Sequence, residues 1–343
     1  MFGTRLSGLD GLRAICALFL LWGHIAQHDF CNWRLLSIPV PECCAYVFFV
    51  ISGFLAGFRM DSISSICHYY KKKARRILPL YYSYLILSVL AYICLGKTTE
   101  VINTKLLYYM LLLPNIPFSN QAGILPLVHL WFIGTLVFFY LLFPLFARLK
   151  DRTPLVSFLI IIFWFALKLI ARFFLGKDSF VYRFVGVTSF DILFLGVLSG
   201  IALKNGSRIT TAIKKSIISK PLSITAWLLF LLSGLYGSLI PAFVRSEYIA
   251  VLALLIILTQ QCPKPLPRLD CTLFKWLGNI SYEIYVVQIL VIILLSEGYT
   301  ALHLNLSGIL IYLICTLIVI GVAWVYHQWL QRFSAQKRTV SNA

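Results

Sequence analysis

The first hydrophobic segment contains an arginine and a histidine whose types and spacing suit a catalytic or binding site. Arg13 lies near the start of this segment, over residues 9–24, and His24 lies at its end, eleven positions later. That separation is about 16 Å and nearly three turns of a helix, so both side chains share one helix face. Ionisable residues in a membrane segment are costly and usually face protein or water. The pair is either functional, or a snorkelling arginine with a histidine that hydrogen-bonds to a neighbouring helix.

The densest cationic patch is the run Lys71–Arg76, in which five of six residues are lysine or arginine. It leads into a third apolar segment through Pro79. Guanidinium groups bind phosphate in a bidentate geometry, so this run can hold a phosphorylated ligand. The alternative is a positive loop that retains the helices and touches anionic lipid.

A second histidine, His129, begins the apolar segment 127–147 and is followed by Trp131. A histidine can accept a proton from a hydroxyl near neutral pH, whereas the alternative is interfacial hydrogen bonding beside an aromatic belt residue. Asp191 can orient a histidine or pair with a cation in an apolar segment, and the sequence leaves both roles open. The ionisable residues in later apolar segments are Lys168, Arg172, Asp191 and Glu283.

The elements that must position these residues are membrane helices. The chain has 343 residues, of which 60% are hydrophobic and 12% charged, which excludes an ordinary soluble globule. The composition predicts an all-α integral membrane protein with one polytopic domain over 1–343 and its core over 9–330. Its formal net charge of +18 comes mainly from basic loops between spans, so we expect no nucleic-acid partner.

Ten apolar segments are long enough to cross a bilayer. They lie at about 11–28, 44–60, 78–96, 127–147, 155–175, 184–203, 221–240, 246–262, 277–297 and 307–330. With both termini cytoplasmic, 22 of the 30 lysines and arginines fall inside, as the positive-inside rule requires. A further crossing at about 105–118 would break that rule. We therefore expect 105–118 to be re-entrant or interfacial, near the outer face.

The cysteines show no metal-binding spacing, and we expect no metal. Cys31 can form a disulfide with Cys43 or Cys44 if their loop is extracytoplasmic.

Five motifs, in this order, resemble those of the acyltransferase-3 family of membrane acyltransferases, which includes O-antigen acetylases. They are Leu9-Asp-Gly-Leu-Arg-Ala with His24, then Phe48-Phe-Val-Ile-Ser-Gly-Phe-Leu55, Arg75-Arg-Ile-Leu-Pro-Leu-Tyr81, Leu112-Leu-Pro-Asn115 with His129-Leu-Trp-Phe and Phe139-Tyr-Leu-Leu-Phe-Pro144, and Leu277-Gly-Asn-Ile-Ser-Tyr-Glu-Ile-Tyr285. The chain resembles the stand-alone form of the family, without an esterase-like domain.

Three positions depart from the family pattern. The basic motif RxxR is present only as Lys72-x-x-Arg75 or Lys73-x-x-Arg76. The middle signature lacks its usual glutamate, and the late motif ends in Gln288 where the family usually has histidine.

The resemblance implies transfer of an acyl group, usually acetyl from acetyl-CoA, to a hydroxyl of an envelope or exported glycan or a lipid-linked sugar. It implies a multi-pass protein of the bacterial cytoplasmic (inner) membrane. His24 would act as general base or carry the acyl group. The expected donor-binding residues are Arg13, Lys72, Lys73, Arg75 and Arg76, and the expected acceptor-binding residues are Asn115, His129 and Trp131. A transporter and a non-catalytic subunit of a polysaccharide assembly system are the alternatives.

Overall fold

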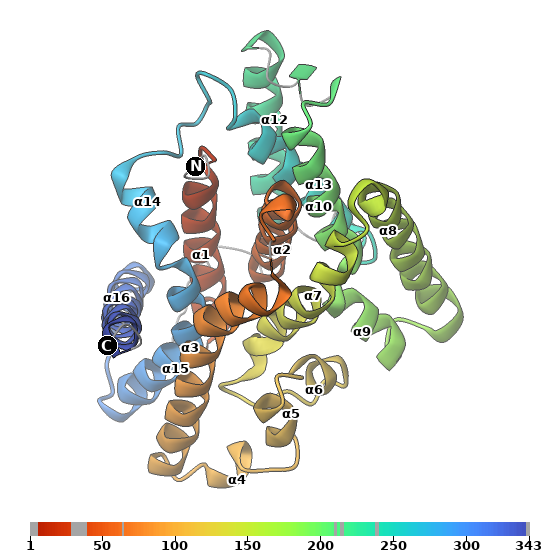
Figure 1. Cartoon of the computed structure of the whole chain (residues 1–343). Helices are drawn as coiled ribbons and strands as arrows, with labels where there is room; N and C mark the ends of the chain where they lie inside the picture. The colour runs from red at the N-terminus through yellow and green to blue at the C-terminus, as the bar shows by residue number, and fades with distance from the viewer. Residues whose placement is uncertain are drawn as a thin grey trace.

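The computed structural model describes residues 6–28, 40–63, 65–208, 211–212, 216–236 and 240–340, and this part of the chain is helical without a strand. The prediction of an all-α fold is confirmed. The longer helices are α1 (Leu9–Ile25), α2 (Val40–Phe58), α3 (Ile66–Cys94), α7 (Trp131–Ala147), α8 (Thr153–Ile170), α9 (Phe180–Thr188), α10 (Phe190–Lys204), α12 (Ser216–Leu235), α13 (Arg245–Thr259), α15 (Ser281–Ala301) and α16 (Gly308–Val340). The helices form a bundle, with the beginning of α1 toward one end and the short helix α4 (Thr98–Val101) at the other (Figure 1).

Seven helical segments in the described residues are long and apolar enough to cross a membrane. They are Val40–Phe58, Ile66–Cys94, Val128–Ala147, Lys150–Leu175, Phe180–Lys204, Ser281–Ala301 and Gly308–Arg332. The other three predicted spans coincide with α1, α12 and α13, of which α1 has 17 residues and α13 has 15. Each predicted span therefore falls on one helix or on two consecutive helices of the described residues, while ten crossings and cytoplasmic termini stay predictions.

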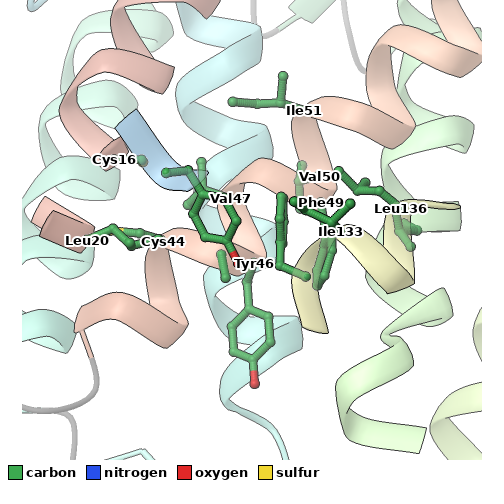
Figure 2. Packing of buried hydrophobic residues seen from close by; sticks show 14 of the residues in the cluster. Cys16, Leu20, Cys44, Tyr46, Val47, Phe49, Val50, Ile51, Ile133 and Leu136 are labelled. Atoms are coloured by element: carbon green, nitrogen blue, oxygen red, sulfur yellow. The ribbon is translucent and has the colours of Figure 1, made fainter. Parts of the chain in front are cut away.

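Helix α2 lies at the centre of the bundle, because 72% of its apolar window is buried, whereas the window around α8 is only 17% buried and exposes apolar side chains. Side chains of α2 pack between Cys16 and Leu20 of α1 on one side and Ile133 and Leu136 of α7 on the other (Figure 2). A helix covered on all sides by other helices can present polar groups to a protein-lined cavity instead of lipid.

Small residues bring α2 and α10 into close contact. Gly53 and Gly57 of α2 lie against the carbonyl groups of Leu193 and Val197 of α10, so a Cβ at either glycine would overlap those oxygens. This small-xxx-small spacing is typical of membrane helices whose backbones approach closely. It fixes α2, and with it the inward-facing residues of α2.

The stretch at about 105–118 does not form a span. It contains two short helices, α5 (Leu106–Met110) and α6 (Asn115–Ser119), which lie beside the beginning of α7 (Figure 1). Tyr109 is buried, its carbonyl accepts a 2.8 Å hydrogen bond from Tyr81 of α3, and its hydroxyl accepts one of 3.1 Å from the amide of Ile124. These contacts satisfy irregular backbone at this end of the bundle.

The basic run Lys71–Arg76 is helical, where the sequence analysis treated it as a loop. Helix α3 begins at Ile66 and continues through the run without a break. Ser65 caps it, since its hydroxyl accepts from the backbone amide of His68, and lysine, alanine and arginine favour helix. The run therefore has a defined inner face.

Candidate active site

A cavity of about 430 Å³ lies between α1, α2, α3, α7 and α15. Among the residues that the structure describes, five lysine or arginine side chains line it, and no carboxylate does. Four of them were predicted, and Arg59, at the end of α2, was missed. The cationic lining residues are Arg13, Arg59, Lys72, Lys73 and Arg76.

Helical periodicity decides which basic residues of α3 reach the cavity. Lining residues recur at positions 65, 68, 69, 72, 73, 76 and 77, which is the spacing of one helix face. Arg75 falls off this face and does not line the cavity. Lys73 is held there by aromatic rings, because its Nζ lies 3.6 Å from the centre of the Tyr140 ring.

Arg13 enters the same cavity from α1. Asp10 pairs with its guanidinium at 3.5 Å, a contact that residues three positions apart on one helix can make. The charges of Arg76 and Arg59 also act on Arg13. This cavity therefore gathers positive charge that a single carboxylate does not balance, and a multiply charged anion would complement it.

Three aromatic side chains close the inner end of the cavity, and we call them the aromatic floor: Phe48, Phe132 and Tyr285. On each of the three helices, this aromatic residue is the cavity-lining residue that lies farthest from the cationic end. Phe48, for example, lies eleven positions before Arg59, which is about 16 Å along α2. The ring centres of Phe48 and Phe132 lie 6.0 Å apart, and those of Phe132 and Tyr285 lie 5.0 Å apart. The cavity is therefore cationic at one end and aromatic at the other.

The two histidines lie on the far side of this floor. Neither lines the cavity, yet the ring of His129 packs edge-on against Tyr285 at 5.3 Å, and its carbonyl accepts a hydrogen bond from the Tyr285 hydroxyl. His24 interacts electrostatically with His129 and lies within interaction range of Gln288, one turn beyond Tyr285 on α15. The structure therefore brings His24, His129 and Gln288 together, and we call these three residues the histidine site.

The histidine rings have nitrogen atoms that are free to bind a ligand. Nε2 of His129 lies 3.0 Å from the carbonyl oxygen of Val286, so Nε2 carries the proton and Nδ1 can accept one. Among the described residues, Nδ1 of His129, Nδ1 of His24 and Oε1 of Gln288 are buried without a hydrogen-bond partner. Buried polar atoms without partners are rare, and such a group suits binding of a polar ligand.

Asn115 and Trp131 do not line the cavity either. Asn115 is buried and donates to the hydroxyl of Thr135 at 2.6 Å, while Trp131 stacks on Phe118 of α6 at 5.2 Å. Both residues attach α6 to α7. Their proposed contact with an acceptor stays a prediction.

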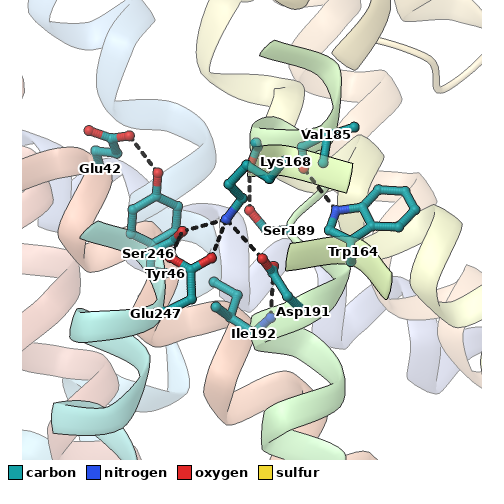
Figure 3. Close-up of polar contacts among 11 residues, drawn as sticks. Glu42, Tyr46, Trp164, Lys168, Val185, Ser189, Asp191, Ile192, Ser246 and Glu247 are labelled. Atoms are coloured by element: carbon teal, nitrogen blue, oxygen red, sulfur yellow. Dashed lines mark hydrogen bonds and ion pairs between the residues drawn. The ribbon is translucent and has the colours of Figure 1, made fainter. Parts of the chain in front are cut away.

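Asp191 pairs with Lys168, which decides between the partners left open by the sequence. Lys168 Nζ lies 2.8 Å from Asp191 and 2.9 Å from the Ser246 hydroxyl, and it also pairs with Glu247 (Figure 3). Lys168 and Asp191 are 2% and 1% exposed, so this cluster is buried between α8, α10 and α13. Its cation is fully engaged within the protein, which indicates a structural role.

Glu283 also has a partner that the sequence analysis missed. Nδ1 of His327 on α16 lies 2.7 Å from Glu283, and the amide of Gln331 lies 2.7 Å from Nε2 of the same ring. These residues, with Arg76, line a second cavity of about 440 Å³ beside the first. His327 lies one turn before Gln331, but nothing in the sequence links either to Glu283.

The described residues contain no group of three or more His, Cys, Asp or Glu side chains that could hold a metal ion. Cys31 lies outside the described residues, so its pairing with Cys43 or Cys44 stays a prediction.

Comparison with known proteins identifies the family. O-acetyltransferase OatA of Staphylococcus aureus strains NCTC 8325 / PS 47, COL and MRSA252 is 28% identical over 221 residues, which cover 58% of this chain and 35% of each relative. The chain thus spans about a third of the length of these relatives, and no solved structure matches it. The model of the acyltransferase-3 family, described as an acyltransferase domain, matches residues 6–328. Because this match covers nearly the whole sequence, the chain belongs to the acyltransferase-3 family.

Proposed function

We propose that this chain transfers an acetyl group from acetyl-CoA to a hydroxyl of an envelope glycan or lipid-linked sugar. The observation that carries the proposal is a cavity that the described residues line with five cations and no carboxylate, and that ends at an aromatic floor in contact with the histidine site. Family membership supplies acyl transfer, and the relatives' name, O-acetyltransferase, supports an oxygen acceptor and an acetyl group.

The cationic end of the cavity suits the phosphates of coenzyme A. Arg13 and Arg76 offer guanidinium groups for bidentate contacts, and Lys72 and Lys73 add point charges. Within the described part of the chain, no lining carboxylate repels the anion. The pantetheine arm would then extend along the cavity and direct the thioester toward the aromatic floor.

The histidine site suits general base catalysis. In the proposed step His24 takes the proton of the acceptor hydroxyl while the hydroxyl oxygen attacks the thioester carbonyl. The carbon–sulfur bond then breaks, and the protonated histidine returns its proton to the departing thiolate. His129 and Gln288 would hold the acceptor by hydrogen bonds from the other side of the floor. A short-lived acyl-histidine is the alternative role for His24.

Loop charge supports an assignment of the two sides of the membrane. If the chain crosses ten times with cytoplasmic termini, the cationic end of the cavity would face the inside, where acetyl-CoA is made, and His24 and His129 would lie toward the outside. The protein would then act in the bacterial inner membrane and hand an acyl group across it.

Sealed membrane vesicles of the two orientations test the proposal. Labelled acetyl-CoA is added outside inverted vesicles, which expose the cytoplasmic face, and label is measured on glycan or on a surrogate sugar inside. We expect transfer by inverted vesicles only, and none by vesicles that lack the chain. Export of a sugar without acetylation would support a transporter, and neither activity would support a non-catalytic subunit.

A further inference from the structure

The aromatic floor lies between the cationic cavity and the histidine site. Phe48, Phe132 and Tyr285 line the end of the cavity, and His129 contacts the other side of Tyr285. An acyl group that enters with a donor held by the cations must therefore pass these rings to reach His24. This inference rests on the proposed function, because it concerns which acyl group is transferred.

The floor is a braced constriction. Phe132 and Tyr285 are each only 4% exposed, and Phe132 also stacks on Phe49 with ring centres 4.6 Å apart. The Tyr285 hydroxyl is tied to the carbonyl of His129. Protein interiors at crystal-like density transmit strain, so extra volume at this point must displace several packed rings at once.

We propose that Phe132 restricts the acyl group to acetyl and is the residue that determines donor chain length. It is the ring that contacts both other members of the floor as well as Phe49. A single methylene commonly changes kcat/KM by about 10–200-fold where it must enter a packed apolar site. Butyryl, two methylenes longer than acetyl, would therefore be strongly rejected although its coenzyme A portion is the same.

Phe143 provides a matched control. It lies on the same helix as Phe132, is buried and lines the same cavity, but it is eleven positions away, about 16 Å nearer the cationic end. Phe132→Leu and Phe143→Leu remove similar volume from one cavity. Only the first widens the floor.

The test compares kcat/KM for butyryl-CoA with that for acetyl-CoA in membranes that carry wild type, Phe132→Leu or Phe143→Leu. We expect the butyryl-to-acetyl ratio to rise at least about tenfold in Phe132→Leu and to stay within about twofold in Phe143→Leu. Butyryl-CoA should inhibit acetyl transfer by the wild type competitively, because the cations still bind its phosphates. Equal ratios in all three proteins, or an equal rise in both variants, would overturn the inference.

Measurements on the wild type distinguish failure of this inference from failure of the proposed function. They do not depend on whether a variant folds. Acetyl transfer with rejection of propionyl-CoA and butyryl-CoA supports both. Equal transfer of all three acyl groups overturns the selection by Phe132 and leaves acyltransfer standing. Absence of any transfer overturns the proposed function itself.

Discussion

Removal of the buried cation Lys168 should destabilise the protein severely. Lys168→Met keeps much of the length and apolar volume of the side chain but deletes an ammonium that bonds Asp191 at 2.8 Å, Ser246 at 2.9 Å and also Glu247. Asp191 is 1% exposed, so water cannot replace the lost partner. The two carboxylates would then face each other without this cation.

The expected cost follows from that geometry. Breaking a buried ion pair by removing one partner typically costs about 3–5 kcal/mol, because a buried charge is left uncompensated. Replacing the whole set by well-packed hydrophobic residues of similar volume is often close to neutral or stabilising. The triple variant Lys168→Met, Asp191→Leu, Glu247→Met should therefore recover most of the stability that Lys168→Met alone loses.

Thermal unfolding of the detergent-solubilised protein, followed by the loss of the monodisperse species, measures this effect. The control is Lys97→Ala, which breaks a solvent-accessible pair with Glu297 whose hydrogen bond raises the pKa of Lys97. Such pairs contribute about 0–1 kcal/mol, so the control should unfold close to wild type. If Lys168→Met unfolds at the wild-type temperature, the cluster does not hold α8, α10 and α13 together.

Two further variants test helix packing and donor binding. Gly53→Ala should destabilise the protein by about 1–3 kcal/mol in the same unfolding assay, because its Cβ would overlap a carbonyl of α10, whereas Gly321→Ala meets no atom within 4 Å and should be tolerated. In the transfer assay, Arg76→Ala should raise the KM for acetyl-CoA by about 10–150-fold. This factor corresponds to the loss of one charge-assisted hydrogen bond worth about 1.5–3 kcal/mol. Arg75→Ala should leave that KM near wild type, since Arg75 lies off the cavity face. Equal effects of the two arginine variants would contradict the assignment of the cavity.

Most of the fold could be predicted from the sequence because long apolar runs indicate membrane helices. Each of the ten predicted spans falls on one helix or on two consecutive helices in the described part of the chain, and the stretch at 105–118 is not a span. The Asp10–Arg13 contact also follows from local spacing alone. Local signals of this kind need no knowledge of which helices are neighbours.

The candidate site was only partly predictable, because it depends on contacts between distant helices. If α3 had been predicted to begin at Ile66, helical periodicity would have placed Arg75 and Arg76 on different faces. The basic run was not included in a predicted helix because it is too polar for a membrane span. The choice of Lys168 as partner of Asp191 and the meeting of Glu283 with His327 arise from packing across the bundle. The aromatic floor likewise joins rings of α2, α7 and α15, whose register no local pattern encodes.

The rate of acetyl transfer by His24→Ala tests the central claim most directly. The measurement uses inverted vesicles at saturating acetyl-CoA, with protein amounts matched by immunoblot and with His303→Ala, a change at an exposed histidine, as control. The account predicts a loss of about 10²–10⁴-fold for His24→Ala, the usual contribution of a positioned general base, and wild-type transfer by the control. Transfer by His24→Ala within twofold of wild type would contradict the claim that His24 performs the chemistry.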